Sequence, residues 1–255
     1  MARVDISLGY GALDGQVLGF LARELIAFVL YMHQQMPRTF DQMQIELRGM
    51  EGSVRDETTR KSLGKNLQRF VRKTKKLHKF LDCVERLMVA VESAINSTAP
   101  GVVEIVLLIG SNVARPQVVY RLKNFGELSD SSSSAEKTKI DLKQLTTKMI
   151  RELLSSGITE KVAGPTKLFL LVKASPEFMP TLSENFLPKR AFTWNSAKAS
   201  EISIDFLRGE SLEEANSEKI WYWNYFRKVL VQACCNYRFQ CRHFVKGQPS
   251  SKELC

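Results

Sequence analysis

The sequence predicts an α+β fold in which three helices pack on one face of a mostly antiparallel sheet. Apolar residues recur at helical spacing over 18–32, 67–95 and 140–154, whereas short apolar runs typical of strands occupy 102–109 and 167–173. The order of helices, a hairpin, a helix and then strands favours helices on one side of the sheet. With 255 residues, 44% hydrophobic and 25% charged, the chain is long enough for a sizeable core and is not mainly disordered.

The first two helices have recognisable ends. In 18–32 the apolar residues lie three or four positions apart, and Pro37 ends the pattern because a proline disfavours the helical conformation of the residue before it. The second helix, 67–95, repeats this spacing over more turns. It stops at 96–101 (Asn-Ser-Thr-Ala-Pro-Gly), which is a dense turn signal.

Strands are expected after this turn. The unbroken apolar run 102–109 predicts a buried strand, and the alternation of Val118, Tyr120 and Leu122 predicts an antiparallel partner with one covered face. Three more strands are expected at 167–173, at 202–206 with the alternation of an edge strand, and at 220–226, which is rich in aromatic residues.

The chain is expected to form one domain over 16–226. Residues 1–15 are predicted to be a flexible segment, and 227–255 a C-terminal extension whose structure the pattern does not define. Inside the domain, 129–139 (SDSSSSAEKTK) has the composition of a solvated linker.

The third helix, 140–154, has a wide apolar stripe. Met149 and Ile150 are neighbours, as are Leu153 and Leu154, so both members of each pair cannot face one sheet equally. Either the helix contacts a second surface or it is buried on two sides, and the sequence leaves both possibilities open.

Positive charge is concentrated in one segment. The chain has 37 Lys and Arg against 27 Asp and Glu, and nine of the cations lie in 60–79, where there is no acid. On the helix, the cations expected on the exposed side are Arg69, Arg72, Lys73, Lys76 and Lys79. A solvated helix face is the favoured interpretation, followed by an acidic protein partner. Nucleic acid comes last, because no aromatic residues are interleaved on the polar side to stack on bases.

The residue types of an active site are present but not arranged as one. None of the three histidines has a carboxylate or thiol at the spacing of a triad or a metal-binding helix. The strongest metal candidate is the set Cys234, Cys235, Cys241 and His243, which lacks the paired loops of a structural zinc site. No enzyme activity, metal or cofactor is therefore expected.

Location is also constrained. No secretory signal and no disulfide framework are visible, and the best apolar windows, 25–32 and 102–109, are shorter than a membrane-spanning helix. The chain is expected in the cytosol or the nucleus.

Several short motifs, taken together, resemble the Comet family of checkpoint-silencing adaptors. Tyr31-Met32-His33-Gln34-Gln35-Met36-Pro37 after the first helix, with an aromatic residue at Phe40, follows the family's Tyr-x-x-Gln-Gln-hydrophobic-Pro pattern. Further matches are Val-Leu-Leu-Ile-Gly at 106–110, Pro116 with Tyr120, Lys-Met-Ile-Arg-Glu-Leu-Leu at 148–154, and Ile220-Trp221. These scattered motifs cover about 18–223.

The resemblance implies a HORMA-like domain whose C-terminal strands form a closed safety belt. It implies an adaptor that binds the closed form of a HORMA protein, of the spindle checkpoint or the meiotic axis, and presents it to the pachytene-checkpoint AAA+ ATPase. Nucleus and cytoplasm are the expected locations, with meiotic chromosomes a further site in a meiotic role. The partner-binding residues that it implies are Met32, Gln34, Gln35, Met149, Ile150, Arg151 and Leu154. The alternative is a nucleic-acid- or chromatin-binding protein that uses the basic helix 60–79.

Overall fold

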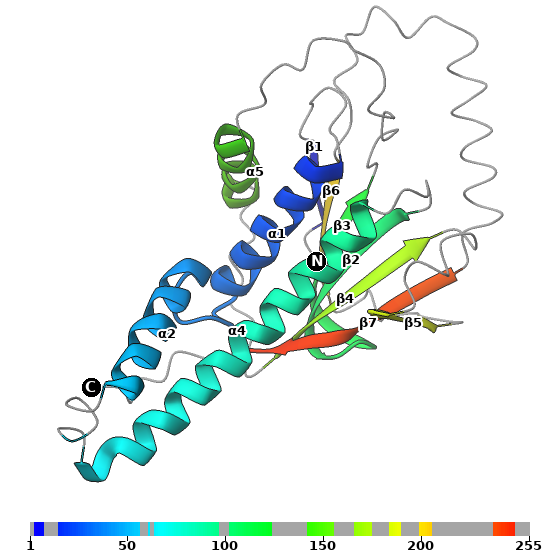
Figure 1. Ribbon diagram of the computed structural model, residues 1–255. Coiled ribbons are helices and arrows are strands. Elements are labelled where there is room, and N and C mark those ends of the chain that lie inside the picture. Colours follow the sequence, from blue (N-terminus) through cyan, green and yellow to red (C-terminus); the bar gives the residue numbers. More distant parts are fainter. Residues whose placement is uncertain are drawn as a thin grey trace, which may run out of the picture.

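The computed structural model places four helices and a seven-stranded mixed sheet (Figure 1). It describes residues 3–7, 15–56, 61, 64–96, 102–123, 142–155, 166–174, 184–189, 199–205 and 237–247. The helices are α1 (Gly15–Met32), α2 (Phe40–Arg55), α4 (Leu67–Asn96, after the 3-10 turn Gly64–Asn66) and α5 (Leu142–Ser155). The strands are β1 (Arg3–Ser7), β2 (Val102–Asn112), β3 (Arg115–Lys123), β4 (Lys167–Ala174), β5 (Phe186–Lys189), β6 (Ser200–Asp205) and β7 (Tyr237–Lys246).

The sheet is ordered β1-β6-β3-β2-β4-β7-β5. Neighbouring strands are antiparallel except at β6, which runs parallel to both β1 and β3. The α+β class is confirmed, and so is the hairpin of β2 and β3. Strand β6 was predicted as an edge strand, and this is wrong because β1 pairs along its outer side, so that β1 and β5 form the edges.

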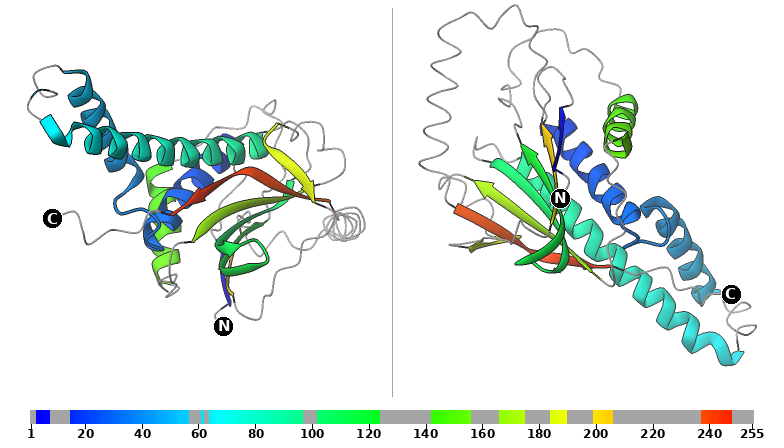
Figure 2. Two further views of the ribbon diagram at one scale, coloured as in Figure 1. Left: turned by 90° about the horizontal axis from the view of Figure 1, so that it is seen from below. Right: turned by 180° about the vertical axis from the view of Figure 1, so that it is seen from behind.

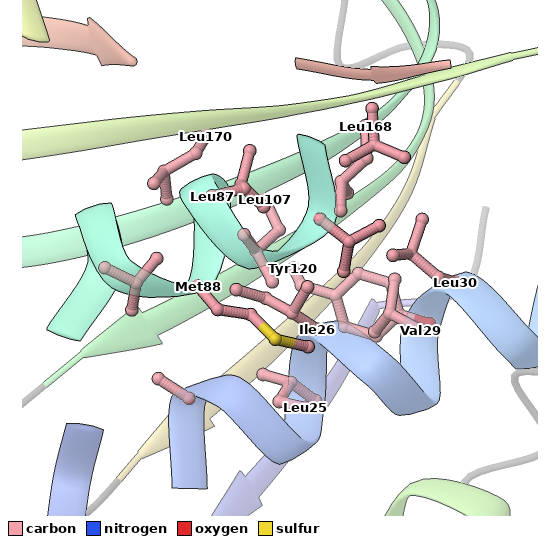
Figure 3. Packing of buried hydrophobic residues seen from close by; sticks show 14 of the residues in the cluster. Leu25, Ile26, Val29, Leu30, Leu87, Met88, Leu107, Tyr120, Leu168 and Leu170 are labelled. Carbon is pink, nitrogen blue, oxygen red and sulfur yellow. The ribbon is translucent and has the colours of Figure 1, made fainter. Parts of the chain in front are cut away.

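Helices α1 and α4 lie together across one face of the sheet (Figure 2). Between them and the sheet is the main core, in which α1 contributes Leu25, Ile26, Val29 and Leu30, and α4 contributes Leu87 and Met88. Figure 3 shows these side chains meeting Leu107, Tyr120, Leu168 and Leu170 from three neighbouring strands. The alternation along each strand sends every second side chain into this layer.

The opposite face of the central strands is also buried. A second cluster is formed there by Val106, Leu108, Val113, Val119, Phe169, Leu171 and Ala199, all from strands or adjoining turns. The expectation that β3 has a single covered face is therefore wrong, since Val119 is as fully buried as Tyr120 on the other side. Next to this cluster, Arg121 bridges Glu104 and Glu201, with 2.8 Å between its Nη1 and the Glu201 Oε1.

Helix α2 was not predicted, and with it the described residues contain four helices where three were expected. Its apolar residues Phe40, Met43, Leu47 and Met50 have helical spacing, and Thr39 with Gln42 forms a reciprocal capping box at its start. Both signals are present in the sequence, but only Phe40 was used there, as the aromatic residue of the family motif. Figures 1 and 2 show α2 alongside the N-terminal half of α4, the two extending beyond the sheet as a helical arm.

The predicted domain limits also change. Residues 3–7, within the segment predicted to be flexible, form β1, and residues 237–246 of the predicted C-terminal extension form β7 between β4 and β5. Alternation of the buried residues Phe239 and Cys241 was the missed signal for this strand. The predicted linker 129–139, the strand 220–226 and the Ile220-Trp221 motif lie outside the described residues.

Helix α1 is long and apolar enough to cross a membrane by length and composition, which the sequence analysis did not expect. Seven of its eight buried residues belong to the core formed with α4 and the sheet. A helix buried in this way meets the same length and hydropathy criteria as a spanning one, so the apolar character of α1 is accounted for by packing.

Candidate functional site

Helix α5 turns one narrow side to the core. Its buried residues Leu145, Met149 and Leu153 lie four positions apart. Ile150 is partly buried, and Leu154, one turn further along the same side, is 45% exposed. The wide apolar stripe thus consists of a buried row and an accessible row, so that this helix is not buried on two sides.

Only some of the contact residues predicted on α5 are accessible to a partner. Met149 is 0% exposed and packs in the core, so it anchors α5 and does not face a partner. Arg151 and Leu154 are exposed, and Ile150 is partly buried. The accessible part of the predicted motif is therefore Ile150, Arg151 and Leu154.

The motif after α1 forms the end of that helix. The Gln35 N–H donates to the Leu30 carbonyl (2.8 Å), and the Gln34 N–H donates to the Tyr31 carbonyl (3.0 Å). Gln34 has a φ of 56°, and these two bonds around a left-handed residue make a Schellman cap. The Gln-Gln pair is thus explained by the turn, which leaves the Gln34 side chain exposed and buries Gln35.

Gln35 packs against Gly247, the residue that follows β7. Its side-chain Nε2 donates to the His33 carbonyl (2.8 Å), and its Oε1 is buried without a hydrogen-bond partner. A Cβ built on Gly247 would lie 1.8 Å from this Oε1, so only glycine fits there without displacing Gln35. The predicted contact residue Gln35, 3% exposed, is therefore a packing residue between α1 and the C-terminal strand.

Residues from two of the motifs that carry the family resemblance meet in the core. His33 Nε2 lies 2.7 Å from the Tyr120 hydroxyl oxygen, and both side chains are buried. Gly110 faces Pro116 across a bulge between β2 and β3, and a Cβ on Gly110 would lie 2.7 Å from the Arg115 carbonyl oxygen and 2.8 Å from the Pro116 Cα. These positions are constrained by packing and do not form an exposed site.

An open groove of about 770 Å³ lies between α1, α2 and α4. Tyr31, 45% exposed, lines it together with Ile150 of α5. Tyr31 also lines a smaller hollow of about 270 Å³ with Met32 and Gln34. Ile150 from one predicted motif and Met32 and Gln34 from the other therefore line hollows that share Tyr31. Tyr31 itself was not among the predicted contacts.

The groove has an apolar floor and an acidic rim. Residues on its rim are the carboxylates Glu24, Asp41, Glu51, Asp82 and Glu85 and the guanidinium groups of Arg23 and Arg48, for a net charge of −3. Burial of Glu24 raises the pKa of its carboxyl group, the nearby Asp41 carboxylate raises it further, and Arg23 opposes both. No local sequence pattern indicates this site, because it depends on α2 packing against α4.

The basic face predicted on α4 is present on the helical arm. Arg69, Arg72, Lys76 and Lys79 are exposed, as predicted. Lys73 is exposed too, but its Nζ pairs with the Glu46 carboxylate of α2 at 3.3 Å. The arm therefore carries positive charge on one side of α4.

No catalytic arrangement is present in the part of the chain that the structure describes. His33 is bound to Tyr120, whose pKa is raised by burial, and His78 is exposed at the groove. No three His, Cys, Asp or Glu side chains among these residues lie close enough to hold a metal ion. Cys234 and Cys235 of the predicted metal candidate lie outside the described residues, and Cys241 is buried beside β4 and β5.

No protein-family model and no curated protein matches this chain. Functional assignment therefore depends on the accessible row of α5, the exposed end of α1, the groove and the basic arm.

Proposed function

We propose that this protein is a non-catalytic adaptor that binds the closed form of a HORMA protein through α5 and presents it to the pachytene-checkpoint AAA+ ATPase. The supporting observation is that Ile150 and Leu154 remain accessible while Met149 and Leu153 anchor the same helix in the core. A helix anchored by one buried row, with a second apolar row accessible, is suited to docking on a preformed partner surface.

A HORMA-like fold is part of the same proposal. Support comes from α1 and α4 on one face of the sheet, from the β2–β3 hairpin followed by α5, and from a C-terminal strand placed between β4 and β5. A safety belt consists of C-terminal chain added to the sheet, and the pairing of β7 with β4 and β5 supports this part of the proposal.

The experiment is a binding titration against the closed form of a HORMA protein from the same organism, with the open form alongside. Closed-selective binding is expected. Ile150→Asp should weaken it about a hundredfold, because an unpaired carboxylate is costly in a desolvated interface. Its matched control is Ile45→Asp, the same substitution at a 67% exposed position on α2.

The outcome separates docking from misfolding. Both variants should melt within a few degrees of the unaltered protein, because neither side chain is buried in the core. Equal loss of affinity in Ile45→Asp, or no loss in Ile150→Asp, would remove α5 from the interface. Absence of binding to both HORMA forms would end the adaptor proposal.

A second candidate function is nucleic-acid or chromatin binding by the basic arm. The observation that favours it is that Arg69, Arg72, Lys76 and Lys79 are exposed and make no ion pair within the described structure. Binding to duplex DNA should then weaken steeply with salt, by about 0.9 in log affinity per log salt for each phosphate contacted. Arg72→Gln should reduce this slope, whereas Arg151→Gln on α5 should not. A salt-independent affinity would rule out this candidate.

A further inference from the structure

The groove between α1, α2 and α4 combines two properties that rarely occur together on a solvated surface. Its floor is apolar, formed by Ala27, Phe28, Leu47, Leu81 and Met88. Phe28 and Leu47 are packed against the core yet only partly buried, so apolar surface is left facing the groove. Such surface favours a partner that brings apolar side chains of its own.

The acids of the rim fall into two groups. Glu85 is paired with Arg23 at 3.0 Å, and Asp82 with Arg86 at 3.1 Å. Glu24, Asp41 and Glu51 make no ion pair with any residue that the structure describes. The rim groups without an ion pair among the described residues are therefore Glu24, Asp41, Glu51 and Arg48, which together give α1 and α2 a net charge of −2 at the groove.

The position of Glu24 is electrostatically unfavourable in the isolated chain. Glu24 is half-buried, and the loss of water is the largest cause that raises the pKa of its carboxyl group. The Asp41 carboxylate is the next cause and raises this pKa further. Two carboxylates held near each other at a partly buried site are stabilised by any cation placed between them. Arg23 provides part of this compensation, but its guanidinium group is also bonded to Glu85 and Glu92.

We propose that this groove binds a basic amphipathic helix of a protein partner. Apolar side chains at helical spacing would cover the floor, and lysines or arginines on the adjoining side would meet Glu24, Asp41 and Glu51. The same negative charge repels nucleic acid and anionic membrane surfaces, which excludes them as occupants. This inference stands apart from the adaptor proposal, although Ile150 borders both surfaces.

The test uses the whole chain and two synthetic peptides that share one amphipathic helical pattern. One combines leucine with lysine, and the other combines leucine with glutamate. Fluorescence anisotropy should give the lysine peptide at least about tenfold higher affinity, falling as salt is added. Equal affinity for the two peptides, or no binding of the lysine peptide, would overturn the proposal.

Two isosteric variants locate the binding. Glu24→Gln and Asp41→Asn should each weaken the lysine peptide by about threefold to tenfold, since each removes one of the uncompensated charges. Glu184→Gln, which removes an exposed carboxylate beside β5, should leave the affinity unchanged and serves as the matched control. If all three variants bind alike, the peptide is attracted by overall charge and not by the groove. Because no HORMA protein is used, the result is independent of the adaptor proposal.

Discussion

The two rows of α5 predict opposite consequences for two truncations only five positions apart. Met149 is 0% exposed, so Met149→Ala removes three buried heavy atoms. At about 0.8 kcal/mol per buried group, the lost transfer free energy is about 2.4 kcal/mol, and a residual cavity adds to it. Leu154 is 45% exposed, and Leu154→Ala should change the free energy of unfolding by no more than about 0.5 kcal/mol.

Urea denaturation of both variants measures this difference. The midpoint for Met149→Ala should fall while the dependence on denaturant stays constant, because the same surface becomes exposed on unfolding. The midpoint for Leu154→Ala should remain close to that of the unaltered protein. Under the adaptor proposal the order reverses for HORMA binding, where Leu154→Ala has the larger effect.

One pattern of stability changes would contradict the buried and accessible rows described for α5. If Met149→Ala cost less than about 0.5 kcal/mol and Leu154→Ala cost more, α5 would have to be rotated on α1 relative to the arrangement described. The buried row Leu145, Met149 and Leu153 would then not be the contact with the core.

Three further predictions concern the turn after α1 and the C-terminal strand. Gln34→Gly should raise the free energy of unfolding by up to about 1 kcal/mol, since glycine adopts a φ of 56° without strain. Thermal melting measures this change, and a lower melting temperature would contradict the expectation. Gly247→Ala should lower the free energy of unfolding by about 1–3 kcal/mol, because the new methyl group displaces Gln35. In a double-mutant cycle, adding Gln35→Ala should recover part of that loss. Strictly additive losses would contradict the contact between the two residues. Burial raises the pKa of Cys241 from 9.0 to about 11, so the folded state keeps a proton that the unfolded state releases, and stability should fall by at most about 1.4 kcal/mol per pH unit from pH 9 to 11. Cys241→Ala should remove most of this dependence between pH 9 and 10, where Tyr120, with an ordinary pKa of 10.0, contributes less than the thiol. An unchanged pH profile would show that the thiol is not buried.

Local patterns were sufficient for most of the elements. Helices α1, α4 and α5 and the hairpin of β2 and β3 follow from apolar spacing, because a helix or strand repeats its orientation every few residues whatever it packs against. Helix α2 was missed although its capping box and spacing are equally local. Only Phe40 of this helix entered the prediction, as the aromatic residue of the family motif.

Strand β7 was missed for a different reason. The alternating buried residues Phe239, Cys241 and Val245 indicate a strand locally, but they do not show which strands it pairs with. What makes it a strand is hydrogen bonding to β4 on one side and β5 on the other. Pairing partners that distant in sequence are not encoded in a local period.

The candidate sites depended on tertiary structure even more. The sequence by itself determined that 140–154 is a helix with too many apolar residues for one face, and that 60–79 carries a basic face. Only the packing of α5 on α1 decided that Met149 is buried while Ile150 borders a groove. Likewise, only the approach of α2 to α1 and α4 brought Asp41 near Glu24. The physical reason is that spacing specifies which residues share a side of a helix, whereas burial and electrostatic environment depend on what lies opposite that side.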